Sequence, residues 1–483
     1  MSELYAGWED EAAPVQSPSP TYRSSADGRL VSLSMPSPGV TAEAFLALAE
    51  GQERFFWEDV RDDILFAGFG VAAHLLAWGP ERFAHVEAQA RALFADALLL
   101  GPANRLAAPR LFGGFAFRDD FMPDNTWSVF HAAHFLLPHF QLVQAGDESW
   151  LTINALLPPE ERDSGETLRD ELSAALQARY DWLCDAARQE RPAATLGASA
   201  PPLEVNYPMS YEAWAAMIQE AIRQIETTPL QKVVLARVAE LRFRERIDVN
   251  GALAYLDRHY PDSYRFLFEP RPHHAFYGAT PELLVRVSGQ TLTTMAMAGS
   301  IRRSADPIED AALGQALLNS AKDRHEHDLV VMSLLERLAP LTAQLEISPQ
   351  PGVYKIANIQ HLLTPVRGRL LEALGVLPVA AALHPTPALG GKPRALAMAF
   401  IQQVEPVPRG WYAAPVGWID VHMDGAFAVA IRSAIAQERR VWLYAGAGIV
   451  ADSEPDKEWE ETALKFRPML EALGVEESHE RQP

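Results

Sequence analysis

The chain has 483 residues, 48% hydrophobic and 22% charged, which is typical of a globular protein with a large core and excludes a disordered chain, a collagen or a coiled coil. Its 63 acidic residues exceed its 42 Lys and Arg residues, and the formal net charge of -21 disfavours binding to nucleic acid. A single cysteine, Cys184, excludes an internal disulfide and a cysteine-based metal site and suits a cytoplasmic protein.

The two ends of the chain are the segments least suited to packing. Residues 1–27 are rich in Pro, Ser and acidic side chains without a hydrophobic period, so we expect a disordered tail there and a short second tail at 476–483. The sequence contains neither a signal peptide nor a window apolar enough to span a bilayer, so we expect neither secretion nor a membrane partner.

Residues 28–200 form the first half of the predicted fold and mix strands with helices. Strand-like runs cover 64–69, 110–117 and 149–156, and helical patterns cover 80–100 and 166–189. Gly113 and Gly114 interrupt one strand, which indicates a bulge or a close approach of two backbones. The stretch Arg191 to Pro208 contains four prolines and no helical or strand period, so we place the main internal boundary there.

The second half, residues 207–475, is predicted to be antiparallel sheet with packed helices. It opens with a helix at 210–226 and the strand QKVVLARV (231–238), whose continuous apolar character predicts burial on both faces. Two hairpins follow, around turns at 288–290 and 424–425, and the second joins a strand at 411–421 to one at 426–436.

Two single residues suit acid–base chemistry. Lys232 lies among apolar neighbours, and burial favours the neutral amine of a general base. The commoner interpretation of such a lysine is an amine that reaches water at the edge of a strand. Glu282 follows Thr280 and Pro281 at the mouth of a hairpin, where partial burial keeps a carboxyl group protonated as a general acid. A glutamate at the start of a strand is more usually hydrated.

Two helical segments each carry a pair of carboxylates on one face. Asp323 and Glu326 lie three residues apart in AKDRHEHDLVVMSLLERL. Glu458 and Glu461 have the same spacing in SEPDKEWEETALKF, where Ser453 predicts the helix cap. Such oxygen ligands suit a hard divalent cation, whereas an exposed acidic face is the commoner explanation of any one such run.

The C-terminal strands carry groups that suit an anion. Arg432 is expected in the strand AFAVAIRSA, on one face with Ala428 and Ala430, whose small side chains leave room beside its guanidinium. An arginine that meets solvent at a sheet edge is an equal alternative. Gly446 and Gly448 would let backbone amides approach a carboxylate or phosphate, but no later strand supplies the acid of a dinucleotide site.

Taken together, these segments resemble the chorismate-utilising enzyme family, which includes isochorismate, salicylate, anthranilate and aminodeoxychorismate synthases. The resemblance spans about residues 207–473 and rests on the ordered motifs QKVVLARV, GATPELLVRV, MAGSIRR, KDRHEHDLVV, IQHLLTPVRG, LHPTPALGGKPR, AFAVAIRSA and AGAGIVADSEPDKEWEETALK. It implies one large α/β domain of two packed antiparallel β-sheets flanked by helices.

The resemblance also implies a role for each candidate residue. Glu326 and Glu461 would bind Mg²⁺, with support from Asp323 and Glu458. The family positions that contact the substrate correspond here to His361, near the ring carboxylate, and to Leu389, Tyr412, Arg432, Gly446 and Lys465.

Three positions favour isochorismate synthase, an isomerase of the hydroxymutase type, among the family members. Lys232 stands where the aminating enzymes carry glutamine. Ala298 stands where aminodeoxychorismate synthases often carry a nucleophilic lysine, and Leu389 where many salicylate synthases carry threonine. The implied reaction is reversible: Lys232 takes a proton from water that adds at C2 of chorismate, while Glu282 protonates the departing C4 hydroxyl.

The resemblance leaves two alternative activities and implies few partners. Salicylate synthase adds pyruvate elimination to the same first reaction, and anthranilate synthase component I is the weaker alternative. We expect chorismate as the small-molecule substrate, no obligatory amidotransferase subunit, and a monomer or homodimer. Whether the product enters menaquinone or siderophore biosynthesis depends on neighbouring enzymes.

Overall fold

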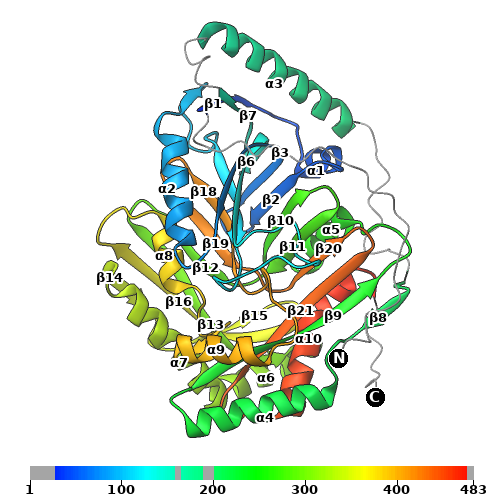
Figure 1. Cartoon of the computed structure of the whole chain (residues 1–483), viewed down its shortest axis with the longest axis vertical. Helices are drawn as coiled ribbons and strands as arrows, with labels where there is room; N and C mark the ends of the chain where they lie inside the picture. The colour runs from blue at the N-terminus through cyan, green and yellow to red at the C-terminus, as the bar shows by residue number, and fades with distance from the viewer. Residues whose placement is uncertain (1–27, 158–164, 189–200, 476–483) are drawn as a thin grey trace.

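The computed structural model describes residues 28–157, 165–188 and 201–475 (Figure 1). The predicted tails at 1–27 and 476–483 lie outside these ranges, as does the predicted linker up to residue 200. In the rest of the linker, β8 (Glu204–Asn206) pairs with β9 (Lys232–Arg242), so the expectation that this segment contains no strand was wrong. The strand forms because Pro201 and Pro202 precede it and leave the N–H groups of residues 204–206 free to pair.

The described strands form one hydrogen-bonded network that divides at β6 (Ala133–Ala145). One edge of β6 pairs with β3, and the opposite edge pairs with β5 near its start and with β7 near its end. Two sheets therefore grow from one strand, and all their pairings are antiparallel except β1 with β4. The mixed α/β fold of packed antiparallel sheets is confirmed.

The first sheet consists, in order of pairing, of β3 (Ile64–Ala77), β2 (Arg54–Asp59), β10 (Tyr264–Arg271), β11 (His274–Thr280), β20 (Ser433–Gln437), β21 (Arg440–Ile449), β9 and then β17 (Gly391–Lys392). The second consists of β5 (Arg110–Phe115), β18 (Pro415–Asp420), β19 (Gly425–Val429), β12 (Leu283–Ser288), β13 (Thr291–Arg302) and β16 (Ile359–Leu370), which carries β14 (Thr342–Ile347) and β15 (Gly352–Lys355). Beyond β6 lie β7 (Glu148–Leu157), β1 (Arg29–Pro36) and β4 (Leu98–Leu100).

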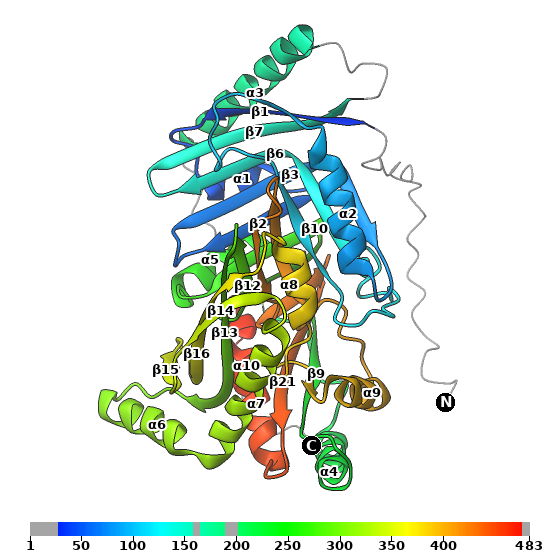
Figure 2. The ribbon, with the colours of Figure 1, turned by 90° about the vertical axis from the view of Figure 1, so that its left-hand side faces the viewer.

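Helices pack on the strands of both sheets (Figure 2). The helices of the first sheet are α2 (Arg82–Ala95) on β3, α5 (Val249–His259) on β11, α9 (Arg394–Val404) on β9, and α10 (Pro455–Ala472) on β21 and α4 (Tyr211–Thr227). The second sheet carries α6 (Pro307–Asn319) and α7 (Ala321–Leu338) on β13 and α8 (Val376–Leu383) on β12. The remaining helices, α1 (Ala42–Leu48) and α3 (Gly165–Arg188), pack on each other.

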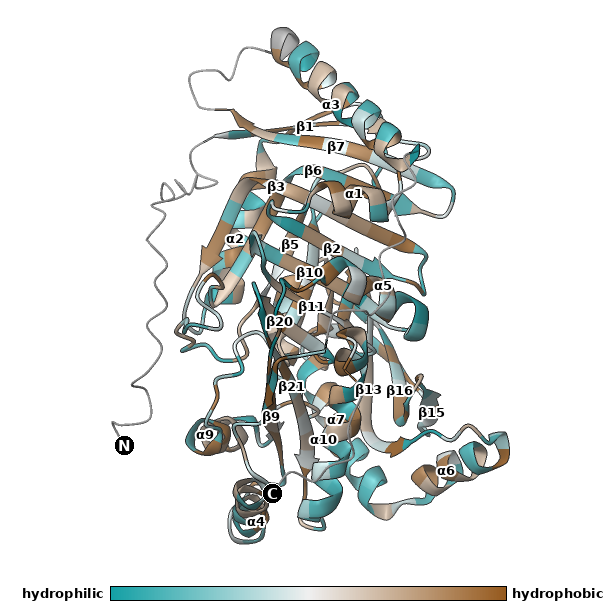
Figure 3. Ribbon diagram, turned by 90° about the vertical axis from the view of Figure 1, so that its right-hand side faces the viewer, coloured by the Kyte–Doolittle hydropathy of each residue, from teal (hydrophilic) through white to brown (hydrophobic). Residues whose placement is uncertain are grey.

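The elements with the clearest hydrophobic pattern formed as predicted. The apolar residues of α7 that recur at helical spacing are buried, and Ser210 caps α4 by accepting a hydrogen bond from Ala213 N. Eight consecutive residues of β9 are buried, and much of the hydrophobic sequence lies in the interior strands (Figure 3). Within the described residues, no helix combines the length and apolar character needed to cross a membrane.

Several predicted boundaries were wrong. The strand expected at 64–69 continues to Ala77, and the strand expected at 411–421 begins only at Pro415. The helix expected at 80–100 ends at Ala95, and residues 98–100 form β4 because they pair with β1. The strand expected at 426–436 breaks after Val429, where the chain leaves the second sheet for β20 of the first. Ser453 does not cap α10, since Glu454 occupies the N-cap and the Ser453 hydroxyl accepts instead from Val450 N.

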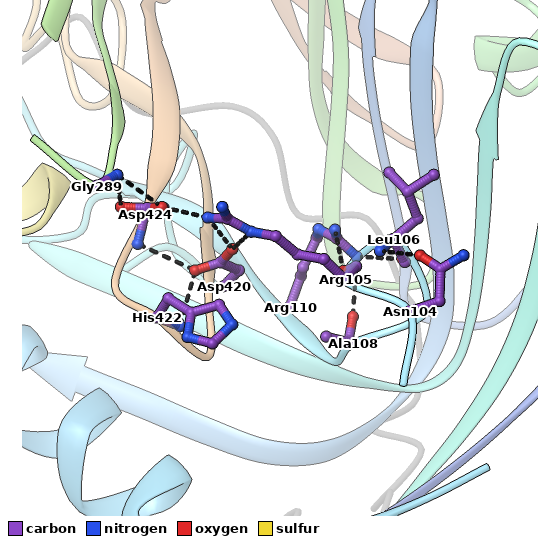
Figure 4. A network of polar contacts seen from close by, with 9 residues as sticks. All are labelled: Asn104, Arg105, Leu106, Ala108, Arg110, Gly289, Asp420, His422 and Asp424. Atoms are coloured by element: carbon purple, nitrogen blue, oxygen red, sulfur yellow. Dashed lines mark hydrogen bonds and ion pairs between the residues drawn. The ribbon is translucent and has the colours of Figure 1, made fainter. Parts of the chain in front are cut away.

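A polar network joins the two halves of the sequence at the turn between β18 and β19 (Figure 4). Arg105, from the loop before β5, forms ion pairs with Asp420 and Asp424, which flank the β18–β19 turn. Both oxygens of Asp424 also accept from Gly289 N, at 2.8 and 2.9 Å, in the turn between β12 and β13. The loop before β5 and two hairpins of the second half therefore share one network.

Candidate active site

The chain crosses from one sheet to the other at two adjacent points, and each crossing carries a candidate residue. Glu282 lies between β11 and β12, and Arg432 lies between β19 and β20. The crossings are hydrogen-bonded, because Val429 N donates to Glu282 O at 3.0 Å and Ala279 N donates to Arg432 O at 3.1 Å. The division of the fold into two sheets thus brings an acid and a guanidinium into one interior region.

Lys232, at the start of β9, is completely buried, so the alternative of an amine that reaches water is wrong. Its Nζ lies 2.7 Å from Oε1 of Glu326 on α7. Gly448 on β21 makes room for this pair, since a Cβ there would collide with the Glu326 carboxylate. The pair joins a strand of the first sheet to a helix of the second.

Glu282 is the buried carboxyl group of the site. Burial raises its pKa to about 8, although the positive charges of Lys232, Lys465 and Arg432 act in the opposite direction. The side chain therefore carries its proton at neutral pH and can donate it. The predicted role of Glu282 as a general acid requires a protonated side chain. The side chain stays protonated because the crossing between the two sheets is buried in the interior.

Arg432 is also buried, and it adopts the left-handed backbone conformation with φ of +49°. The strand conformation predicted for it was wrong, because the chain must turn there to enter β20. A non-glycine residue in this conformation costs about 1 to 2 kcal/mol, which the surrounding sheet must offset. Burial raises the pKa of Tyr412 to about 12, although the positive charge of Arg432 acts to lower it.

One ring nitrogen of His361, on β16, lies within hydrogen-bond distance of two protein groups, and the other has no partner among the described residues. Its Nδ1 lies 3.1 Å from Gly299 O and 3.0 Å from the hydroxyl of Ser300 on β13. Burial, followed by the charges of Arg432 and Lys465, lowers its pKa to about 3. The neutral ring therefore donates from Nδ1 to the Gly299 carbonyl, and the buried Nε2 has no hydrogen-bond partner among the described residues.

Helix α10 adds a lysine and two carboxylates. Lys465 Nζ donates to Gly446 O on β21 at 2.8 Å and to Glu461 at 2.5 Å. Burial opposes ionisation of Glu461, but the charge and hydrogen bond of Lys465, together with the charge of Lys322, outweigh it and lower the pKa of that carboxyl. Glu458 is almost fully buried and accepts from Lys322 on α7 at 2.7 Å.

The four carboxylates have the chemistry of a site for a hard divalent cation. Burial and then the charge of Glu461 raise the pKa of Glu458 to about 7, and burial together with the charge of Glu326 raises that of Asp323. These acids therefore repel one another, and a cation between α7 and α10 would relieve the repulsion. Within the described residues, no three of them yet converge closely enough to coordinate one ion.

Leu389 lies in the segment before β17 and is buried. Its carbonyl accepts from Arg409, which also binds Val234 O on β9. Arg409 and Lys322 were not among the candidate residues indicated by the sequence motifs. Lys322 adjoins Asp323 in a motif already singled out, whereas no local pattern indicates the partners of Arg409.

Over residues 17–474, the chain matches the family described as chorismate binding enzyme. It is 39% identical over 420 residues to the "Salicylate biosynthesis isochorismate synthase" of Pseudomonas aeruginosa, covering 87% of this chain and 84% of that protein. It is 34% identical to isochorismate synthase MenF of Bacillus subtilis, over 88% of each chain. Among solved structures, MenF, the menaquinone-specific isochorismate synthase from Escherichia coli, matches with a TM-score of 0.75 and 25% identity, over 92% of this chain and 95% of that one.

Proposed function

Because the chain belongs to the chorismate-binding enzyme family, we propose that it is an isochorismate synthase, an enzyme that converts chorismate reversibly into isochorismate. Two relatives that match it over most of its length carry isochorismate synthase in their names. The residues that separate the members of the family favour the same activity, since Lys232 replaces the glutamine of the aminating enzymes and Ala298 cannot form a covalent intermediate.

The observation that carries this proposal is a buried acid near a buried amine. Burial raises the pKa of Glu282 to about 8, so this side chain holds its proton at neutral pH, and Lys232 is completely buried in the same part of the interior. Exchange of a ring hydroxyl for water needs one group that accepts a proton from water and one that protonates the hydroxyl that leaves. This site offers both groups within one interior region.

In the proposed reaction, Lys232 acts as the unprotonated amine, and its Nζ takes a proton from a water molecule whose oxygen forms a bond to C2 of chorismate. The ring double bonds shift, the C4–O bond breaks, and Glu282 protonates the departing hydroxyl, which leaves as water. One water enters and one leaves, so substrate and product are isomers and no further reactant is required. Arg432 and Lys465 attract the two carboxylates of the substrate and hold it in position.

We also propose that Mg²⁺ binds between α7 and α10. Glu326 and Glu461 would hold it, with Asp323 and Glu458 in support, and the oxygen-only donor set suits this ion. When bound, the ion would neutralise the ring carboxylate of the substrate. A protein with a net charge of -21 could then accept a dianionic substrate.

The test is incubation of the purified protein with chorismate and Mg²⁺, without ammonia, followed by separation of the products and measurement of their masses. We expect isochorismate to accumulate to an equilibrium mixture that is also reached from isochorismate, and we expect a chelator to prevent turnover. Formation of neither isochorismate nor salicylate would contradict the proposal.

Salicylate synthase is the second candidate. It adds one step, in which the ether C–O bond of isochorismate breaks and the hydrogen on C2 moves to the methylene carbon of the side chain, giving salicylate and pyruvate. Leu389, where many salicylate synthases carry threonine, favours release of isochorismate. Release of one pyruvate for each chorismate consumed would instead assign the protein to this activity.

A further inference from the structure

Arg409, in the turn between α9 and β18, is a buried guanidinium whose bonds run to separate parts of the site. Its Nη1 donates to Leu389 O at 2.9 Å, and its Nη2 donates to Val234 O at 2.7 Å. Its Nε donates to Glu405 at 2.8 Å, and the ring of Phe117 lies against it with 4.3 Å between the guanidinium carbon and the ring centre. Every edge of the planar group is therefore in contact with the protein.

The two carbonyl groups belong to segments that carry candidate residues. Val234 follows Lys232 by two positions in β9, and Leu389 lies two positions before the start of β17. The two-residue strand β17 pairs this segment with β9, with backbone bonds from Val234 N to Gly390 O at 2.9 Å and from Gln231 N to Lys392 O at 2.8 Å. A ladder this short leaves Leu389 outside it, and Arg409 supplies the additional link.

The backbone of Arg409 and the carboxylate that pairs with its side chain make further bonds in the site. Tyr412 N donates to Arg409 O at 2.9 Å, so the turn that carries Arg409 continues directly into Tyr412. Glu405 neutralises the guanidinium and accepts from Ala236 N on β9 at 2.9 Å. The side chains of Arg409 and Glu405 are only 2% and 5% exposed, so each is the necessary counter-charge of the other.

We propose that Arg409 is a positioning residue for the reaction proposed above. Its guanidinium holds Leu389 at a set distance from the strand of Lys232 and does not itself touch the substrate. Arginine is required because its rigid fork reaches two carbonyl groups and a carboxylate at once, whereas the single ammonium of lysine cannot span them. The inference rests on the proposed function, since the reaction is the readout.

The test combines Arg409→Lys with Leu389→Ala and compares each single variant with the double variant. We expect Arg409→Lys to lower kcat/KM for chorismate about 100-fold, the order of loss caused by a displacement of about 1 Å in an active site. In the Leu389→Ala background the same change should cost less than about 3-fold, because the side chain that Arg409 positions is already absent. A role confined to stability would leave the two effects independent, and their fold-changes would multiply.

Arg337→Lys is the matched control. Arg337 donates to Leu383 O and Pro385 O, both at 2.7 Å, and so anchors the other end of the segment that carries Leu389 without contacting β9. We expect its kcat/KM to stay within about 3-fold of the wild type and to show no coupling to Leu389. Equal losses in the Arg337 and Arg409 variants, or multiplying effects in the double variant, would overturn the proposal.

Two further measurements keep the outcomes separate. The wild-type protein is assayed first, and failure to form isochorismate or salicylate there counts against the proposed function and not against the role of Arg409. If Arg409→Lys does not fold, Glu405→Gln replaces it in the same cycle, because Glu405 binds two nitrogens of the guanidinium. Coupling of Glu405→Gln to Leu389→Ala supports the proposal, and multiplying effects overturn it.

Discussion

Replacing Glu282 with glutamine should change how the stability of the protein depends on pH. In the unfolded chain this carboxyl group titrates near 4.5, and in the folded protein burial raises its pKa to about 8. Below pH 4.5 both states hold the proton. Between these values only the folded state holds it, so the wild-type free energy of unfolding falls as pH rises, and the fall levels off above pH 8.

The size of the effect follows from this difference. Each pH unit in the interval changes the free energy of unfolding by about 1.4 kcal/mol. Between pH 5 and pH 7 the free energy of unfolding of the wild type should therefore fall by roughly 3 kcal/mol relative to that of Glu282→Gln. A buried amide has its own cost, but glutamine does not titrate and this cost is the same at both pH values. The change in the stability difference, and not the difference at either pH, is therefore the informative quantity.

Urea unfolding of both proteins at pH 5 and pH 7, in the presence of a chelator and followed by tryptophan fluorescence, measures this quantity. Glu226→Gln is the control, because it makes the same change at an exposed position of α4. If the Glu282→Gln difference is the same at pH 5 and pH 7, the carboxyl group is not held protonated by burial and the reasoning is refuted.

Four further predictions concern the site and the fold. Lys232→Ala should lower turnover by about 10³-fold with an unchanged circular dichroism spectrum, and retained activity would exclude it as the base. Glu461→Gln should weaken binding of Mg²⁺, measured by calorimetry without substrate, by at least about 10-fold, because one charged oxygen ligand is lost. Leu389→Thr should increase pyruvate release from isochorismate, measured with a coupled lactate dehydrogenase assay, and an unchanged ratio of products would remove this position from product choice. Asp420→Asn should lower the free energy of unfolding, measured by urea titration, by about 2 to 4 kcal/mol, because Asp420 is buried and accepts from Arg105 and two backbone N–H groups. A loss below about 0.5 kcal/mol would show that the network in Figure 4 contributes little to stability.

Local pattern was sufficient for the elements whose partners lie nearby in the chain. The helices α4 and α7 have apolar residues at helical spacing, and the hairpins β12–β13 and β18–β19 need only a short turn between two strands. Burial of β9 follows from its continuous apolar run. Where the partner is distant, the pattern was insufficient, as for residues 98–100, which are a strand only because β1 lies beside them.

The candidate site divides in the same way. The ordered motifs indicated which side chains to examine, and the structure brings Lys232 against Glu326, and Lys465 against Glu461 and Gly446. They could not indicate that Lys322 is the counter-ion of Glu458, because the two residues are 136 positions apart in the chain.

The sequence by itself determined the chemical groups of this protein, the order in which they occur and the helices and hairpins that carry them, because these depend on residue type and on interactions between near neighbours. Only the tertiary structure decided that two sheets diverge from β6, that the chain turns at Arg432 where a strand was expected, and that Arg409 joins Leu389 to the strand of Lys232. These features depend on contacts between segments far apart in the chain, and burial, which sets the proton on Glu282, is a property of the whole packed interior.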